Sequence, residues 1–220
     1  MTDAHLTMTR RTGRRLLQLL SAVLVLGLSS CYIPDSFLAE FRISKGGGAA
    51  IDYNGDLVWI PLALDIADSK VSRDEAAEKS QILLKDLGRD GGFKELKQTG
   101  DARFRVSYHR EGCMPDPYLY SFVRRNAQIM SVHVKDRILT VRGSQFRPSD
   151  AARMMAKGVP MRGEFRVVTD AKVTNHNSRD VRAFGPYTVY VWKIENPLSP
   201  SPRLSMEIDP TVCIRENSKP

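Results

Sequence analysis

A short apolar stretch near the N-terminus is the feature that most limits how this chain can fold. Leu16 to Leu28 forms a 13-residue run interrupted by Gln18 and Ser21, and the basic segment Arg10 to Arg15 precedes it. This is the arrangement of an export signal. Because crossing a bilayer takes about 18 apolar residues, a permanent transmembrane anchor is the less favoured alternative. We therefore expect residues 1–30 to be a signal peptide that takes no part in the fold.

The residues after this stretch resemble the lipobox of bacterial lipoproteins. Leu28-Ser29-Ser30-Cys31 matches its order of Leu, two small residues and Cys. The resemblance implies that Cys31 becomes the mature N-terminus and carries acyl chains such as palmitate, which anchor the protein to a membrane of the cell envelope on its periplasmic or extracytoplasmic face. Such an anchor is effectively permanent, because each buried CH₂ contributes ~0.8 kcal/mol. The alternative is an ordinary secretory signal followed by an unrelated Cys. Tyr32 leaves the choice between inner and outer membrane open.

Two further cysteines, Cys113 and Cys213, remain once Cys31 is assigned to the lipid. Two thiols in an oxidising compartment commonly pair, so we expect a disulfide between them. Closing a loop of this length would constrain the unfolded chain by roughly 4–5 kcal/mol in the entropic model. Two separate buried thiols are the alternative.

The mature chain has the pattern of an α+β fold with a mostly antiparallel sheet. Ser72 and Glu75 form a capping box before one main helix over about 73–88, and a short helix is expected over about 149–157. Asn54-Gly55 lies between two apolar runs and predicts a hairpin turn, and Gly46 to Gly48 predicts a flexible connection. Strands are expected at 36–44, 102–109, 128–135, 137–142, 163–169, 171–176, 186–195 and 203–209.

No internal repeat or long linker divides the mature chain. We expect a lipidated tether over 31–34, a single α+β domain over 35–213 and a flexible tail over 214–220. A division into two domains near Pro148 is the main alternative.

The sequence contains no motif that indicates catalysis. The three histidines of the mature chain, His109, His133 and His176, are isolated, whereas metal ligands usually occur in close pairs. No nucleophile elbow or phosphate-binding loop is present. We therefore predict no catalytic residue, no metal ligand and no cofactor. A hydrolase with dispersed catalytic residues stays open.

The charge is unevenly distributed along the chain. The formal net charge is +8, and removing the first 30 residues lowers it to +5. Residues 103–166 hold 13 basic and 5 acidic residues, whereas residues 35–101 are net acidic. A basic surface on a tethered domain could meet anionic headgroups, and a solvated sheet face is the alternative. The candidates for headgroup binding are Arg103, Arg105, Arg124, Arg125, Lys135, Arg137 and Arg142. Nucleic acid is not an expected partner of an exported protein.

Short patches of the mature domain resemble the mycobacterial LppM-type envelope lipoproteins. They are an early Gly-rich hairpin, Lys172 to Asn177, the Trp-bearing segment Val189 to Ile194, and Arg203 to Ile208. The resemblance implies an α+β domain linked to lipid or glycolipid binding. Those relatives often end in a transmembrane helix, and residues 195–220 contain none. No site residue is carried over, and we expect Trp192 to lie in the core.

Three classes of function follow from these observations. The first is a non-enzymatic envelope lipoprotein that binds lipid, glycolipid or another apolar ligand, or supports envelope maintenance, and a cavity of several hundred Å³ would favour it. The second is an accessory lipoprotein that binds an envelope protein, which a flat exposed apolar patch would favour. The third is the hydrolase, which convergent polar groups with perturbed pKa values would favour.

Overall fold

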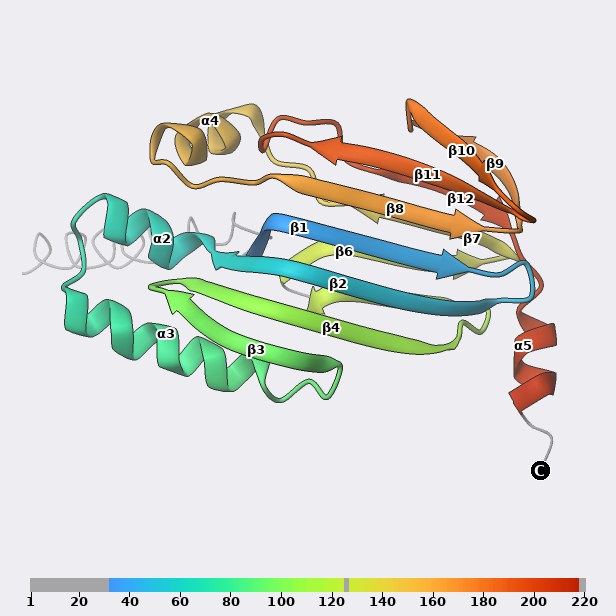
Figure 1. Ribbon diagram of the computed structural model, residues 1–220, viewed down its shortest axis with the longest axis horizontal. Coiled ribbons are helices and arrows are strands. Elements are labelled where there is room, and N and C mark those ends of the chain that lie inside the picture. The colour runs from blue at the N-terminus through green and yellow to red at the C-terminus, as the bar shows by residue number, and fades with distance from the viewer. Residues whose placement is uncertain (1–31, 125–126, 218–220) are drawn as a thin grey trace, which may run out of the picture.

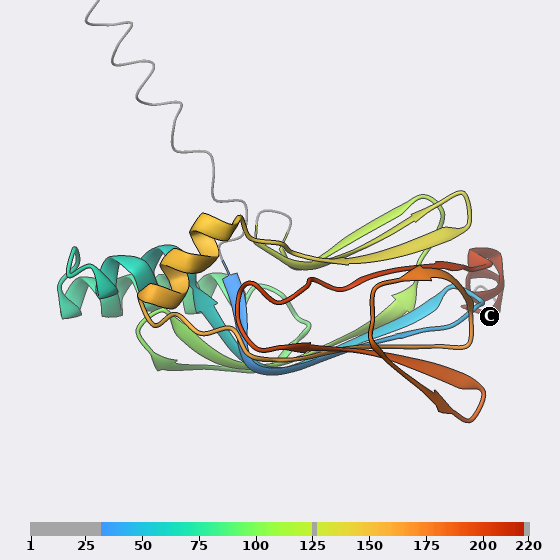
Figure 2. The same cartoon turned by 90° about the horizontal axis from the view of Figure 1, so that it is seen from above.

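Two β-sheets that lie face to face form the protein, as the computed structural model of residues 32–124 and 127–217 shows (Figures 1 and 2). The described residues form twelve strands and four helices, an α+β fold. The expected fold class is confirmed. Cys31, the expected lipidation site, lies outside the described residues, as does Arg125.

The larger sheet has seven strands in the order β10-β11-β8-β1-β2-β4-β3. All neighbours are antiparallel except β1 and β8, which are parallel. The strands are β1 (Tyr32–Ile43), β2 (Gly48–Trp59), β3 (Phe93–Gly100), β4 (Arg103–Cys113), β8 (Gly163–Thr169), β10 (Asp180–Phe184) and β11 (Tyr187–Ile194).

The smaller sheet has five strands in the order β5-β6-β7-β12-β9, all antiparallel. Its strands are β5 (Tyr118–Arg124), β6 (Ala127–Lys135), β7 (Ile138–Gly143), β9 (Lys172–His176) and β12 (Arg203–Glu207). Figure 2 shows this sheet as a second layer over the larger one.

Four helices lie at the two ends of the sheets (Figure 1). They are α2 (Ile60–Ala67), α3 (Arg73–Leu87), α4 (Pro148–Ala156) and α5 (Pro210–Asn217). The first three lie at the end where β1 begins, and α5 lies at the other end. Helix α3 also runs alongside the edge strand β3. The Ser72 Oγ accepts a hydrogen bond from the backbone N–H of Glu75 at 3.2 Å, which caps α3 as the sequence predicts.

The hydrophobic core lies between the two sheets. Strand residues alternate in direction, so one face of each sheet meets the other while the opposite face meets solvent. Phe122 of β5 packs between two tyrosines of the larger sheet, with ring centroids 5.1 Å from Tyr53 and 4.9 Å from Tyr108. Trp192 is buried in the same cluster, as expected. One continuous core therefore joins both sheets.

Most of the expected elements are present. The main helix, the short helix, the alternating strand β4, the hairpin of β6 and β7, and the C-terminal strands β8, β9, β11 and β12 all lie at or close to their predicted positions. These segments share a strong pattern, either a buried stripe at helical spacing or clear alternation.

The predicted turn at Asn54-Gly55 is wrong, because β2 runs straight through it from Gly48 to Trp59. A Cβ added to Gly55 would lie 2.4 Å from the Cβ of Phe37 on the neighbouring strand. Gly55 therefore serves a close approach between strands and not a turn. The hairpin turn occurs earlier, where the backbone N–H of Ser44 donates to the carbonyl of Gly48 at 2.8 Å.

Several elements and one boundary differ from the prediction. Helix α5 extends to Asn217, so 214–217 is not a flexible tail, and β1 begins at Tyr32, so residues 32–34 of the expected tether belong to the sheet. The unpredicted elements are α2, α5, β3, β5 and β10. Both α2 and α5 begin with a proline within their first two residues. Helix α2 has no side-chain cap, whereas Asp209 caps α5 by accepting from the backbone N–H of Thr211 at 3.3 Å. Strands β3 and β10 are edge strands with mostly exposed side chains. Such segments carry weak periodicity.

We predict that Gly55→Ala destabilises the protein by about 1–3 kcal/mol, because the added methyl group would overlap the backbone and side chain of Phe37. Denaturant unfolding of residues 32–220 measures the change. Gly91→Ala is the matched control, since nothing lies within 4 Å of its added Cβ. Equal stability of Gly55→Ala and the control would contradict the assigned role of Gly55.

Candidate functional site

Arg103 and Arg105, two of the predicted headgroup-binding residues, lie on the outer face of β4. The Nη1 of Arg103 donates to Oδ2 of both Asp35 and Asp56 at 2.8 Å, and the Nε of Arg105 lies 2.8 Å from Oδ1 of Asp56. Both carboxylates are buried, Asp35 with only 2% exposed. Burial alone would lower the pKa of Arg103, but the hydrogen bonds with these two carboxylates raise it above its usual value. The two arginines are thus held in an ion-pair network.

The remaining candidates lie on the other sheet. Lys135, Arg137 and Arg142 belong to the hairpin of β6 and β7, and Arg124 is the last residue of β5. Leu139 and Val141 of β7 are buried in the shared core, so Arg142 points to the outer face of the smaller sheet. The side chains of Arg124 and Arg125 lie outside the described residues. The structure therefore places Arg103 and Arg142 on opposite outer faces, and it does not bring the candidates into one stripe.

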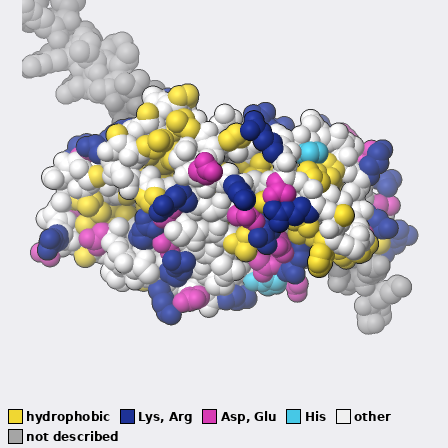
Figure 3. Space-filling model, turned by 45° about the horizontal axis from the view of Figure 1, so that its top comes forward, with side chains coloured by type: hydrophobic (Ala, Val, Ile, Leu, Met, Phe, Trp, Pro, Cys, Tyr) yellow, Lys and Arg dark blue, Asp and Glu magenta, His cyan; other side chains and the backbone are white. Residues whose placement is uncertain are grey.

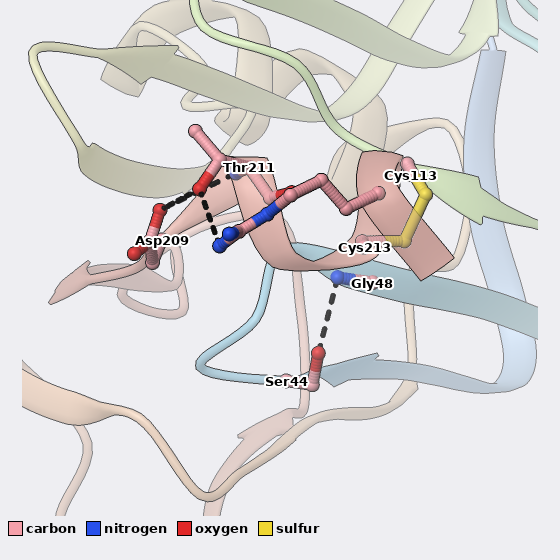
Figure 4. The surroundings of a disulfide bond; sticks show 7 residues. Ser44, Gly48, Cys113, Asp209, Thr211 and Cys213 are labelled. Atoms are coloured by element: carbon pink, nitrogen blue, oxygen red, sulfur yellow. Dashed lines mark hydrogen bonds between the residues drawn. A yellow bond between two sulfur atoms is a disulfide. The ribbon is translucent and has the colours of Figure 1, made fainter. Parts of the chain in front are cut away.

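The predicted disulfide is present between Cys113 and Cys213, whose Cα atoms are 5.7 Å apart (Figure 4). It ties α5 to the end of β4 next to the hairpin turn before β2, where the Oγ of Ser44 accepts from the backbone N–H of Gly48 at 3.0 Å. Nearby, Asp209 accepts a hydrogen bond from the Oγ1 of Thr211 at 2.7 Å, which holds the pKa of Asp209 below its usual range. The disulfide stabilises this end of the molecule.

A groove of about 810 Å³ lies on the outer face of the larger sheet, where the hairpin of β10 and β11 meets the strands β1, β2 and β8. We call it the hairpin groove. Figure 2 shows this hairpin diverging from the two layers. Its lining consists of Glu40, Arg42, Ile43, Ser44, Gly48, Ala49, Ala50, Arg166, Val168, Arg182, Ala183, Phe184, Tyr187, Val189 and Val191.

The floor of the hairpin groove is apolar. Val168 of β8 pairs with Val189 of β11, and Val191 lies two residues further along the same face. Two aromatic residues flank the turn of the hairpin, and they are unusually exposed, Phe184 by 71% and Tyr187 by 42%. A hollowed surface with valines at its base and exposed aromatic rings at its rim is typical of a binding site.

Three arginines bring charge to this groove. Arg182 donates to Asp180 through Nε at 2.8 Å and Nη2 at 2.5 Å, and these hydrogen bonds hold the pKa of Asp180 below its usual range. Arg42 donates to Asp52 at 2.5 Å, and Arg166 pairs with Glu164. Figure 3 shows that basic and acidic side chains alternate over this outer face. The arginines are therefore oriented by carboxylates, with Glu40 the acidic residue of the lining.

The hairpin groove was not predicted from the sequence, but β11 carries a signal of it. Its residues Val189 to Trp192 are all apolar, so both faces of the strand are covered. A strand buried on both faces needs a second layer or a ligand over its outer face.

No group of three or more His, Cys, Asp and Glu side chains within the described residues is placed to hold a metal ion. Over residues 32–124 and 127–217, no helix has the length and apolar character that crossing a membrane requires. Two tyrosines have a strongly raised pKa, Tyr53 and Tyr120, and burial is the main cause for both.

Similarity to known proteins is found among solved structures. No family model matches the chain, and no curated protein matches it. The folded domain of the Mycobacterium tuberculosis protein LppM, solved by NMR, is similar with a TM-score of 0.39 and 12% sequence identity. The similarity covers 86% of this chain and 98% of that domain.

We predict that Arg103→Ala lowers the free energy of unfolding by about 3 kcal/mol, because it leaves the buried carboxylates of Asp35 and Asp56 without their shared partner. Arg142→Ala is the matched control on the other sheet and should change stability by no more than about 0.5 kcal/mol. Denaturant midpoints of both variants test this. A loss no larger than that of the control would show that the network contributes little.

Proposed function

We propose that this chain is a non-enzymatic lipoprotein of the cell envelope, anchored through Cys31, whose folded domain binds an acidic amphiphile in the hairpin groove. The ligand class is a lipid or glycolipid with an apolar chain and a negatively charged headgroup. The export signal and the lipobox-like sequence support the anchor, and the geometry of the groove supports the ligand class.

The observation that carries the proposal is the combination of valines and arginines in one open groove. The apolar floor of Val168, Val189 and Val191 suits a hydrocarbon chain, since each CH₂ removed from water contributes about 0.8 kcal/mol. Arg42, Arg166 and Arg182 can donate to a phosphate or carboxylate, and a hydrogen bond to a charged group contributes about 1.5–3 kcal/mol. The volume of about 810 Å³ lies within the range of small-molecule sites.

The interior of the protein suits such a ligand less well. The aromatic residues Tyr53, Tyr108 and Phe122 fill the space between the sheets. A hollow lined by Phe41, Tyr120 and neighbouring residues measures only about 120 Å³. Ligand sites commonly occupy about 300 Å³ or more. The outer groove is therefore the better candidate.

The absence of an enzymatic role is part of the proposal. The residues that line the hairpin groove include no His or Cys, and Glu40 is their one carboxylate. The two tyrosines with raised pKa values are buried, and burial favours their neutral form. This favours binding over catalysis.

A second function is favoured by the exposed side chains of the hairpin. Val181 and Phe184 of β10 project into solvent, and Leu119 does so on β5, an edge strand of the smaller sheet. Exposed apolar side chains on edge strands are typical of surfaces that bind another protein. Under this alternative, the protein is an assembly accessory and the groove holds part of an envelope protein.

We predict that the full chain, expressed in a bacterium that processes lipoproteins, is cleaved before Cys31 and carries a diacylglyceryl group on that residue. Mass spectrometry of the N-terminal peptide and membrane fractionation measure this. Cys31→Ala should lose both the lipid and the membrane association, whereas Cys213→Ser should keep them. An unmodified Cys31 in the wild-type protein would refute the anchor.

We predict that the folded domain, residues 32–220, binds a fluorescent phosphatidylglycerol more tightly than a fluorescent phosphatidylcholine. Arg182→Glu should weaken binding of the acidic lipid about tenfold, because about 1.4 kcal/mol of charge-assisted hydrogen bonding corresponds to that factor. Arg142→Glu, the matched control on the other sheet, should leave the affinity unchanged. Equal losses in both variants would place the binding outside the hairpin groove.

A further inference from the structure

The first strand leaves no room for a flexible tether. Strand β1 begins at Tyr32, which is 2% exposed, and Ile33 is fully buried. Consecutive Cα atoms are only ~3.8 Å apart, so the residue before Tyr32 stays beside the start of β1 whatever its conformation. An acyl chain on Cys31 would therefore hold this end of the domain directly against the membrane.

Three segments surround the start of β1. Tyr32 pairs with Trp59 across the sheet, and their ring centroids are 4.6 Å apart, so α2, which follows Trp59, begins at the same place. The backbone N–H of Arg162, in the loop after α4, donates to Oδ1 of Asp35 at 3.2 Å. Figure 1 shows the start of β1, α2 and α4 together at one end of the molecule, and α5 at the opposite end.

Helix α4 presents an apolar stripe on its exposed side. Ala151 and Met154 are buried and attach the helix to the domain. Ala152, Met155 and Ala156 are exposed at positions i, i+3 and i+4, which share one helix face, and Met155 is 47% exposed. In Figure 3, hydrophobic side chains gather where α4 and the loop after β11 lie.

Cations border this stripe. Asp68, just after α2, is 3.3 Å from an Nη2 of Arg153, 2.5 Å from the Nζ of Lys157 and 3.0 Å from the Nζ of Lys70. The hydrogen bonds from the two lysines hold the pKa of Asp68 well below its usual range, so it stays ionised. One carboxylate against three cations leaves this cluster positive. It also fixes α4 against the end of α2.

We propose that the exposed face of α4 is a membrane-docking surface. Ala152, Met155 and Ala156 enter the interface of the anchoring bilayer, while Arg153, Lys157 and Lys70 face its anionic headgroups. The inference rests on the proposed lipidation of Cys31, because that anchor makes the bilayer the occupant. Arg42 of the hairpin groove lies ten residues along β1 from Tyr32, so the groove faces the aqueous space roughly 30 Å from the membrane.

The experiment compares two variants of the anchored protein, each labelled at one end of the domain. The full chain is reconstituted, after purification from its own membrane, into vesicles of phosphatidylcholine and phosphatidylglycerol that carry a nitroxide quencher on the lipid. Met155→Cys marks α4, and Lys172→Cys is the matched distal position at the start of β9, exposed at the other end. Cys113 and Cys213 are paired and the thiol of Cys31 is consumed by lipid, so only the introduced thiol takes the fluorophore.

We expect fluorescence at position 155 to be quenched at least twofold more than fluorescence at position 172. Equal quenching, or stronger quenching at 172, would overturn the docking surface. Ala152→Cys, on the same helix face, replaces Met155→Cys if that variant does not fold. Mass spectrometry of Cys31 separates the two proposals. If the residue is lipidated and position 155 is not quenched, the docking surface fails while the anchor stands.

Discussion

The packing of Phe37 against two glycines holds the centre of the larger sheet together. A Cβ on Gly55 of β2 would lie 2.4 Å from Phe37, and a Cβ on Gly163 of β8 would lie 2.3 Å from it. The ring also contacts Phe165 edge to face, with centroids 4.7 Å apart. Because β1 pairs with β2 on one side and with β8 on the other, this contact joins the N-terminal and C-terminal halves of the sheet. The hairpin groove, and the helices α2, α3 and α4 at the end where β1 begins, depend on that junction.

The sequence predicted those parts of the fold whose pattern is local. The alternation of β4 and the capped helix α3 could be recognised because burial and capping each leave a mark on neighbouring residues. Gly55 was misinterpreted because a glycine that admits Phe37 looks the same in sequence as a glycine in a turn. The disulfide between Cys113 and Cys213 was predictable from the cysteine count and the expected oxidising compartment, although their separation of 100 residues carries no local signal. The hairpin groove was not predictable, since its lining comes from five strands that only the topology brings together.

The basic residues show why charge along a sequence and charge on a surface differ. Residues 103–166 are strongly basic in sequence, yet Arg103 and Arg105 lie across from Asp35 and Asp56 of the acidic N-terminal third. Strand pairing thus brings the two oppositely charged segments together and neutralises Arg103 and Arg105, two residues of the predicted basic surface. An excess of positive charge occurs elsewhere, around Asp68 at the end of α2, where three basic side chains share one carboxylate.

The position of Tyr32 connects the anchor with the ligand site. A domain on a long tether would rotate freely, and any of its faces could meet the membrane. Here the strand starts directly after the expected lipidation site, so in the proposed lipidated protein the direction of β1 would set the direction of the whole domain relative to the bilayer. Since β1 leads from the end with α2, α3 and α4 to the hairpin groove, a ligand of that groove in the proposed anchored protein would come from the aqueous space of the envelope and not from the bilayer that holds Cys31. An acidic amphiphile that crosses the aqueous space, or a segment of an envelope protein, could reach the groove from that side.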